Sequence, residues 1–522
     1  MSGYLRRLAT TGAAYTAASI FSKLIAVALL PLYTRFLTAD DYGAAEVMFS
    51  AIVLVSIAVR LGLIEALLRF YYKGGEDPAR VVATSFAALF WLATAATLVA
   101  LPFAKPIAEL LLNQPADPGR IAIPAEDLGR IAIGGLWVST MFEYLLTLFR
   151  LEERARAFFV TTMLSVISAI GLTVILVVGA DEGARGLLLG SYISGAAFVL
   201  GLIWIHRKRL SLRFELPLLR RLMRFGLPTM PAELSLYALN FVDRIIIIRT
   251  LGAAEVGLYS LAVKFAQAVN VLVRGFQLAW PPLAYSIRDD GEARRVYATV
   301  VTLFVAGCAF VVTGMWLLSR WIVRALTTPE FFDSYEAIGL IATGVTLYAL
   351  YMVLVVILGR TGRTEFNLPA TIAALVTNVV LNLILVPTLG IVGAGLALVA
   401  SYIVVLALMY GFTQRLFPVP YEWARLLRVV GVSTTLVLLG EFLLPTDGFI
   451  GLFLRVALWL LYPLVLLATG FFTPAERRWL TRLRQPGALV AELRSLRPAA
   501  AGVDGSVPET YEAEQMDEDS RL

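Results

Sequence analysis

The chain has few histidines, cysteines and charged residues, which are the residues that form metal sites, disulfides and polar surfaces. Its 522 residues include one histidine and one cysteine, and only 16% are charged, whereas soluble domains have about 25%. One histidine and one cysteine argue against a histidine metal site and a disulfide framework, so we expect no metal and no cofactor. No P-loop pattern such as GxxxxGK[ST] occurs, so we do not expect this chain to hydrolyse ATP.

Long apolar runs dominate the sequence, of which 59% is hydrophobic. A helix needs about 20 apolar residues to cross the hydrocarbon core of a membrane. This criterion predicts an all-α polytopic membrane protein with about fourteen transmembrane helices. The candidate spans are 12–36, 45–68, 82–104, 129–150, 158–178, 184–205, 223–248, 257–284, 296–319, 334–358, 367–387, 391–412, 426–444 and 450–471.

The basic residues indicate how the spans are oriented. With an even number of spans both termini lie on one side, and that side carries 30 of the 44 lysines and arginines against 8 in the opposite loops. Because basic residues favour cytoplasmic loops, we expect both termini in the cytoplasm. The external loops are short, which leaves little room for an external catalytic domain.

An internal repeat divides the chain into two halves. At an offset of 214 residues, Gly43 aligns with Gly257 and Arg60 with Arg274, and a second match follows at offset 210. Each half then has six spans and begins on the same side, as in transporters whose substrate path lies between parallel repeats. The predicted parts are a six-helix lobe at 1–205, a basic cytoplasmic linker at 206–225, a second six-helix lobe at 226–412, two extra helices at 413–471, and a cytoplasmic tail at 472–522 with a disordered acidic end.

Polar side chains form stripes along several apolar spans. A charge in the hydrocarbon costs roughly 2.5–3.5 kcal/mol on insertion scales, so such side chains usually face protein or water. At about 100° per residue, the stripe of span 257–284 covers an arc of roughly 140°, and that of span 223–248 roughly 60°. The stripes consist of Lys264, Gln267, Asn270, Arg274 and Gln277 in the first, and of Glu233, Tyr237, Asn240 and Arg244 in the second.

Such stripes either bond helices to one another or line a water-filled cavity. For Asn378 and Asn382 in span 367–387 we favour bonds between helices. The stripe of span 257–284 runs through much of the membrane and contains two cations, which favours a cavity. The first two spans add Lys23 and Arg60, so we expect spans 12–36, 45–68, 223–248 and 257–284 to line a cleft between the halves. Asp243 and Arg244, near the external end of span 223–248, are predicted to form a structural ion pair or a gate.

Three segments carry a resemblance to a known family. They are KLIAVALLPLYTRFLTADDYGAAEV, FGLPTMPAELSLYALNFVDRIIIIRTLGAAEVGLYSLAVKFA and NVVLNLILVPTLGIVGAGLALVASYIVV. In these segments the chain resembles the polysaccharide flippases of the Wzx-like family (O-antigen and exopolysaccharide), within the MOP (MATE-like) exporter superfamily. The resemblance covers about residues 5–471 and identifies the family better than the substrate.

The resemblance implies a MATE-like fold of two lobes around a central cleft, with alternating access. It implies a membrane transporter, not an enzyme, that moves an isoprenoid-(pyro)phosphate-linked oligosaccharide to the outer leaflet. Arg60 and Arg274, one from each half, would then hold the pyrophosphate, with Lys23 and Lys264 further out, since the planar fork of arginine can bind two phosphate oxygens. Alternatively, Arg60 pairs with Glu65 or Glu143 and only braces the helices.

Two other function classes compete with this hypothesis. A MATE-type antiporter of cations or drugs should have dominant carboxylates in its cleft, and a polysaccharide polymerase or ligase should have a large external loop. A lipid II flippase shares the expected fold. The expected partners are a lipid-linked oligosaccharide, membrane lipid, a polysaccharide polymerase and glycosyltransferases, and not nucleic acid.

Overall fold

The computed structural model describes residues 29–73, 75–112, 124–152, 154–287, 289–474 and 476. Within these ranges the secondary structure is helical and includes no strand, which confirms the all-α fold class. All helices named below belong to one unit, which includes the described residues up to Thr469. Most of the predicted first span and most of the predicted tail lie outside the described residues.

The helices follow one another with short connections. The first half of the described chain contains α2 (Leu30–Phe36), α3 (Ala39–Arg60), α4 (Leu63–Lys73), α5 (Pro78–Ala100), α6 (Ala104–Leu112), α7 (Ala125–Leu151), α8 (Ala155–Val174), α9 (Gly183–His206) and α10 (Leu216–Gly226). The second half contains α11 (Met230–Thr250), α12 (Ala253–Ala266), α13 (Val269–Ser286), α14 (Asp290–Leu326), α15 (Tyr335–Arg360), α16 (Asn367–Leu416), α17 (Trp423–Leu443) and α18 (Gly448–Ala468). A six-residue 3₁₀ helix, η4 (Pro329–Ser334), precedes α15.

Ten helical stretches in the described residues are long and apolar enough to cross a membrane, so the chain is a multi-pass membrane protein. One of the ten is α16, which holds two of the predicted spans. The helices α11, α12 and α13, which hold two of the predicted spans, are not among the ten, and α12 has only 14 residues. The number fourteen therefore stays a prediction.

Two predicted spans are interrupted in the structure. The span 45–68 breaks at Leu61 and Gly62, which have φ angles of 50° and 69°, so α3 ends at Arg60 and α4 begins separately. The span 257–284 was predicted as one helix, and this is wrong. The amide of Ala268 bonds to the carbonyl of Phe265, three residues back, and this tighter turn separates α12 from α13.

The boundary predicted between spans 367–387 and 391–412 coincides with a kink in α16. Gly390 has φ 61° and ψ −144°, a backbone conformation that residues with a Cβ rarely adopt. Pro387, three residues earlier, lacks the amide that an uninterrupted helix would use there. The Pro–Gly combination thus divides this 50-residue helix where the sequence predicted two spans.

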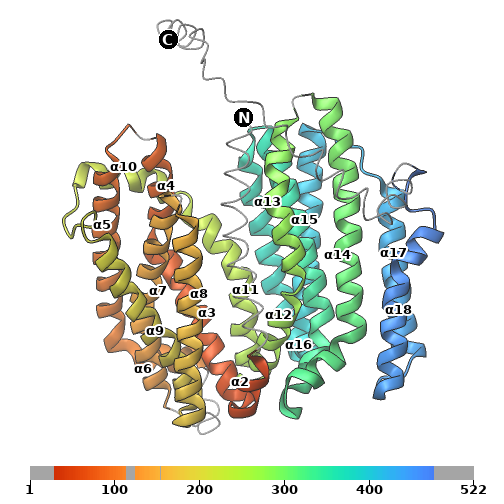
Figure 1. Ribbon diagram of the computed structural model, residues 1–522, viewed down its shortest axis with the longest axis horizontal. Helices are drawn as coiled ribbons and strands as arrows, with labels where there is room; N and C mark the ends of the chain where they lie inside the picture. The colour runs from red at the N-terminus through yellow and green to blue at the C-terminus, as the bar shows by residue number, and fades with distance from the viewer. Residues whose placement is uncertain are drawn as a thin grey trace, which may run out of the picture. The chain divides into compact units, whose positions relative to one another are not determined.

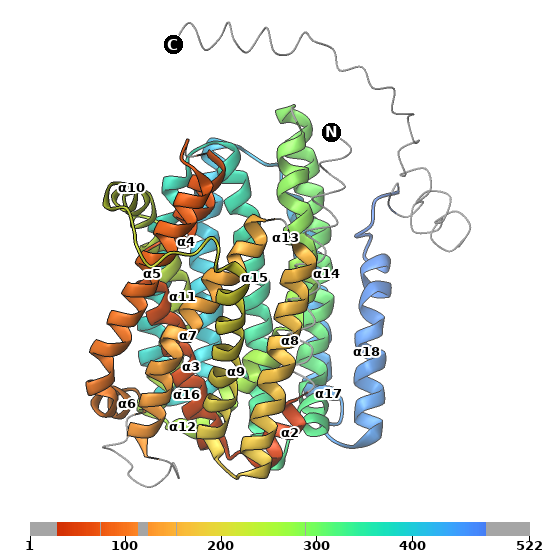
Figure 2. The same ribbon diagram turned by 60° about the vertical axis from the view of Figure 1, so that its left-hand side comes forward.

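Helix α3 connects the two halves of the described chain. It packs against α7 and α9 of its own half, and against α11 and α12 of the other half. In the second half, α16 packs against α11 and α15, while α17 and α18 run beside α14 (Figure 1). The short helix α10 lies against α4 and α5 (Figure 2). The lobe boundaries predicted from the repeat stay predictions.

Two glycines allow α3 and α12 to cross in close contact. A Cβ added at Gly43 would overlap the carbonyl oxygen of Ala253, and one added at Gly257 would overlap that of Ala39. At the offset of 214 residues, Gly43 aligns with Gly257 and Ala39 with Ala253. Each glycine therefore contacts the alanine of the opposite half, so the contact is reciprocal. A two-fold relation between the halves produces such an arrangement.

We expect Gly43→Ala and Gly257→Ala each to lower the thermal stability of the purified protein, because backbone atoms cannot move aside as a flexible side chain does. The expected loss is about 1–3 kcal/mol, typical of overpacked sites, and would appear as a lower Tm in detergent. Gly134→Ala and Gly171→Ala are matched controls in other helices, since a Cβ there meets nothing within 4 Å. Equal Tm values for both pairs of variants would contradict the prediction.

Candidate functional site

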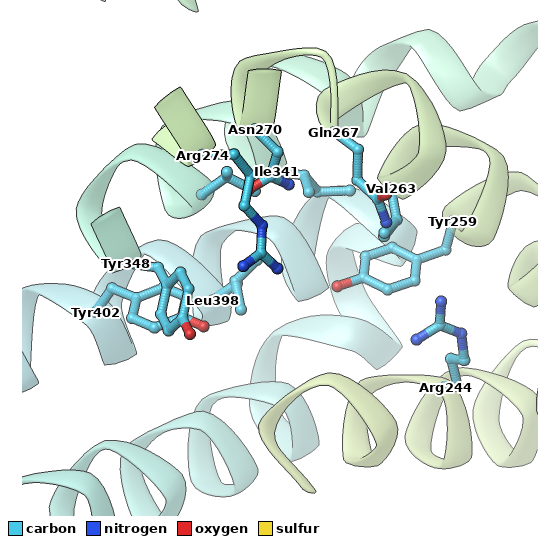
Figure 3. Close-up of a pocket in the computed structure, with 11 residues that line it drawn as sticks. Arg244, Tyr259, Val263, Gln267, Asn270, Arg274, Ile341, Tyr348, Leu398 and Tyr402 are labelled. Atoms are coloured by element: carbon cyan, nitrogen blue, oxygen red, sulfur yellow. The ribbon is translucent and has the colours of Figure 1, made fainter. Parts of the chain in front are cut away.

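A cavity of about 220 Å³ lies among helices of the second half (Figure 3). Its walls come from α11, α12, α13, α15, α16 and the turn between α12 and α13. The described residues of its lining are Arg244, Tyr259, Val263, Gln267, Asn270, Arg274, Ile341, Val345, Tyr348, Leu398 and Tyr402. The charged residues among them are two arginines, and none of them is a carboxylate.

Arg274 presents its guanidinium group to this cavity. The group lies between the hydroxyl of Tyr259 on one side and the paired rings of Tyr348 and Tyr402 on the other (Figure 3). The two rings have centroids 5.7 Å apart. The side-chain oxygen of Gln277 lies 3.4 Å from Nη1 of Arg274, and no carboxylate pairs with Arg274 among the described residues. The cavity therefore offers one uncompensated cation next to hydroxyl groups and aromatic faces.

Several of the predicted site residues meet in this cavity. Gln267, Asn270 and Arg274 line it together with Arg244, which the sequence had placed on a neighbouring stripe. They line one wall of the cavity although a turn interrupts the predicted helix, because α13 follows α12 along that wall. The other predicted residues are not among its lining residues. They are Arg60, Glu233, Tyr237, Asp243, Lys264 and Gln277; Lys23 and the side chain of Asn240 lie outside the described residues.

Lys264 instead takes part in an ion pair between the halves. Its ammonium nitrogen lies 2.6 Å from a carboxylate oxygen of Glu46 on α3 and also donates to the hydroxyl of Tyr42. A guanidinium nitrogen of Arg244 lies 3.9 Å from the other oxygen of Glu46, and Nε of Arg244 donates to Ser260 at 3.1 Å. Glu46 thus compensates two cations of the second half.

Sequence reasoning missed Glu46, although a signal was available. Ala39, Gly43 and Glu46 are spaced i, i+4, i+7, so they share one face of α3. That face carries the glycine matched across the repeat and faces α12 in the structure. Glu46 lies one turn beyond Gly43, where α3 and α12 cross closely, so its carboxylate can reach α12.

Arg60 is buried and joins three helices. One guanidinium nitrogen lies 2.6 Å from Glu143 on α7, and the other lies 3.1 Å from Glu233 on α11. Its side chain is only 5% exposed, while those of Glu143 and Glu233 are 53% and 40% exposed. The pairing with Glu143 is one of the two bracing contacts that the sequence analysis gave as an alternative to substrate binding. Arg60 and Arg274, aligned in the repeat, therefore have different surroundings, and the substrate-binding role of Arg60 stays a prediction.

Asp243 ties α11 to two neighbouring helices. Its carboxylate accepts a hydrogen bond from the hydroxyl of Tyr259 on α12 and another from the amide of Asn382 on α16, both at 2.8 Å. The second bond confirms that Asn382 serves contact between helices. Asp243 is 1% exposed, whereas its neighbour Arg244 lines the cavity. The predicted ion pair between Asp243 and Arg244 stays a prediction.

Each half also caps a helix N-terminus of the other half. Asp40 accepts a hydrogen bond from the amide of Ala254, in the first turn of α12, at 3.1 Å. Glu330, in η4, accepts one from the amide of Ala39, the first residue of α3, at 2.7 Å. Amides in the first turn of a helix lack partners in their own helix, and the helix dipole favours negative charge there. These two cross-caps hold the same ends of α3 and α12 at which Gly43 and Gly257 meet.

Comparisons with known proteins identify the type of chain. The model of a family described as "polysaccharide biosynthesis protein" matches residues 32–335, more than half of the chain. The succinoglycan biosynthesis transport protein ExoT of Rhizobium meliloti is 25% identical over 323 residues, which are 60% of this chain and 61% of that protein. The match therefore spans less than two thirds of that relative.

Solved structures share the fold at low identity. The lipid II flippase MurJ in an inward closed conformation superposes with a TM-score of 0.70 at 13% identity, covering 86% of this chain and 97% of that one. An inward-facing multidrug resistance MATE family transporter of the MOP superfamily gives 0.62 at 18% identity, covering 76% and 95%. At these identities the likeness establishes the fold, which is MATE-like as the sequence predicted.

We expect Glu46→Gln to destabilise the protein by roughly 2 kcal/mol, because it removes the charge that compensates Lys264 and Arg244. Adding Lys264→Met to this variant should cost less than Lys264→Met does alone, since the two side chains interact. The measurement is the Tm of each variant in detergent.

Glu126→Gln serves as the control, since Glu126 and Arg130 form an exposed pair one helical turn apart. Its effect should stay within about 0.5–1 kcal/mol. Strictly additive effects of the Glu46 and Lys264 substitutions would show that their ion pair contributes nothing.

Proposed function

Because the chain belongs to the polysaccharide biosynthesis protein family, we propose that it is a flippase for an isoprenoid-(pyro)phosphate-linked oligosaccharide. It moves the head group from the cytoplasmic to the outer leaflet of the bacterial inner membrane by alternating access, and both of its termini are cytoplasmic. The observation that carries this proposal is the cavity in which Arg274 has no carboxylate partner among the described residues.

The lining of the cavity suits both parts of such a head group. Each sugar hydroxyl costs about 1–3 kcal/mol when it is buried without a hydrogen bond, and Gln267, Asn270 and the tyrosine hydroxyls offer partners. The phosphate is anionic, and the planar fork of Arg274 can bind two of its oxygens. An inside-negative membrane potential adds about 2.3 kcal/mol per charge per 100 mV in favour of outward movement of an anion.

The size of the cavity supports a closed state. Pockets for drug-sized ligands measure about 300–1,000 Å³, so 220 Å³ is too small for an oligosaccharide head group. Loading the substrate therefore requires the halves to move apart. In the predicted topology the cross-caps of Asp40 and Glu330 lie on the external side, and the ion pairs of Arg60 lie on the cytoplasmic side. We propose that these two sets of contacts are the barriers that open in turn.

The same cavity disfavours the rival transporter. An antiporter for cationic drugs needs negative charge where its substrate binds, whereas the lining residues that the structure describes include Arg244 and Arg274 and no carboxylate. A lipid II flippase would carry a similar diphosphate, so the transport assay below has to distinguish the two lipid-linked substrates.

We expect Arg274→Ala to reduce flipping at least tenfold, because the phosphate then enters the cavity without its cationic partner. The assay uses purified protein in liposomes with a fluorescent isoprenoid-diphosphate oligosaccharide, and measures how much becomes accessible to an impermeant quencher. Arg274→Lys should retain part of the rate, since it keeps the charge without the fork.

Arg185→Ala is the matched control, because Arg185 is an exposed arginine that pairs with Glu182 outside the cavity. Wild-type flipping by the Arg274→Ala variant would remove the proposed role of Arg274. If the wild-type protein flips lipid II faster, or exports cationic dyes and flips neither lipid, the proposed substrate is wrong.

We expect a cross-link between the two helix ends at the cross-caps to stop transport. The variant Asp40→Cys/Ala254→Cys replaces two residues in direct contact, and the only native cysteine, Cys308, is buried. A short thiol-reactive cross-linker should abolish flipping in the double variant and leave either single variant active. Unchanged flipping by the cross-linked protein would show that this contact does not need to open.

A further inference from the structure

The connection between α9 and α10 runs along the outside of α5. We call residues 204–216, with the sequence WIHRKRLSLRFEL, the interfacial segment. Figure 1 shows its path beside the Pro78 end of α5, at the edge of the helices of the first half. The sequence indicated here only a basic linker at 206–225.

Two contacts fasten the interfacial segment to α5. The indole nitrogen of Trp91 donates to the carbonyl of Leu212 at 3.0 Å, and the amide of Glu215 donates to the hydroxyl of Thr84 at 3.4 Å. Nε of Arg80 adds a bond of 2.9 Å to the carboxylate of Glu215. From Thr84 to Trp91 the helix rises about 10 Å, which is also about the length of three extended residues. The segment is therefore held in an extended course along the helix.

Large apolar side chains of the interfacial segment point away from the protein. Trp204 is 66% exposed, Leu212 52%, Phe214 43% and Leu216 50%. In a multi-pass membrane protein such exposed side chains face lipid. Tryptophan near the end of a spanning helix is typical of the boundary between hydrocarbon and water, and Trp204 stands two residues before the end of α9.

Three cations of the same segment lack a carboxylate partner among the described residues. Arg207, Lys208 and Arg213 are exposed, and the guanidinium group of Arg207 lies 4.7 Å from the ring centroid of Trp204. Arg209, by contrast, is paired with Glu152 at 2.7 Å. The segment thus combines exposed apolar groups with three charges that nothing in the described protein compensates.

We propose that the interfacial segment is a binding site for the head groups of anionic phospholipids. Its apolar side chains enter the boundary between head groups and acyl chains, and Arg207, Lys208 and Arg213 contact the phosphates. Cationic segments with aromatic and leucine side chains bind membrane surfaces in this way, and each cation near an anionic surface contributes about 1 kcal/mol. The complementarity of charge selects anionic over zwitterionic lipid, and the expected leaflet is the cytoplasmic one.

The site has a consequence for the arrangement of the chain. The same segment leads into α10, which packs against α4 and α5 and then continues into α11 of the second half. Lipid bound here would hold the connection between the halves at the membrane surface. The inference does not depend on the proposed substrate, because it concerns bulk lipid and a surface remote from the cavity residues.

The test compares lipids that contact the intact protein in nanodiscs. Spin-labelled phosphatidylglycerol and phosphatidylcholine report the immobilised fraction of each lipid, and their ratio gives the preference of the protein. The variant Arg207→Gln/Lys208→Gln/Arg213→Gln should lower the preference for phosphatidylglycerol about tenfold or more, as expected for three cations near the surface.

The control variant is Lys105→Gln/Arg130→Gln/Arg185→Gln, which also removes three exposed cations, each paired with a glutamate. It should keep the wild-type preference. Because all six side chains are exposed, the Tm values should stay close to wild type, which separates lost binding from misfolding.

Three results would overturn the proposal. The wild-type protein could lack a preference for phosphatidylglycerol, the segment variant could keep it, or the control could lose it equally. Displacement of the labelled phosphatidylglycerol by micromolar isoprenyl diphosphate would instead assign the surface to the transported lipid. Flipping in liposomes is measured separately, so failure here leaves the proposed function standing.

Discussion

The low dielectric of a lipid bilayer governs the arrangement of charge in this protein. A charge placed there needs a partner or water, and the structure provides partners for nearly every intramembrane ion described above. Glu46 compensates Lys264 and Arg244 across the halves, and Arg60 is held by Glu143 and Glu233. Arg274 differs, since it faces a cavity and not a carboxylate. The contrast separates charges that hold the fold together from a charge that is available to a ligand.

Close backbone contact and cross-capping act on the same helix ends. Glycines at the crossing of α3 and α12 bring the two chains near enough for Asp40 to reach the first turn of α12. The carboxylates of Asp40 and Glu330 then accept hydrogen bonds from amides that lack a partner in their own helix. Small residues, caps and ion pairs therefore meet at one contact between the halves, which would have to separate as a whole in the alternating access that we propose.

Local patterns in the sequence predicted the fold and part of the site. Apolar runs predicted the helices, the Pro387–Gly390 pair marked the kink of α16, and the predicted polar stripe grouped Gln267, Asn270 and Arg274, which line one cavity although a turn separates α12 from α13. Pairings between distant residues were not predictable in this way. Arg60 and Arg274 look equivalent in the repeat, and only the fold shows that Glu233, 173 residues away, reaches Arg60. The positive charge at 206–225 gave no sign that this stretch follows α5.

The reciprocal meeting of Gly43 with Ala253 and of Gly257 with Ala39 has a bearing on the origin of the chain. A contact in which each side presents the same surface to the other is the one that two identical copies use in a symmetric dimer. A half-length ancestor with a single glycine at this place could have paired with its own copy before the gene was duplicated and fused. Fusion would then have freed the two sides to diverge, so that Arg60 came to pair with Glu143 and Glu233 while Arg274 came to face a cavity.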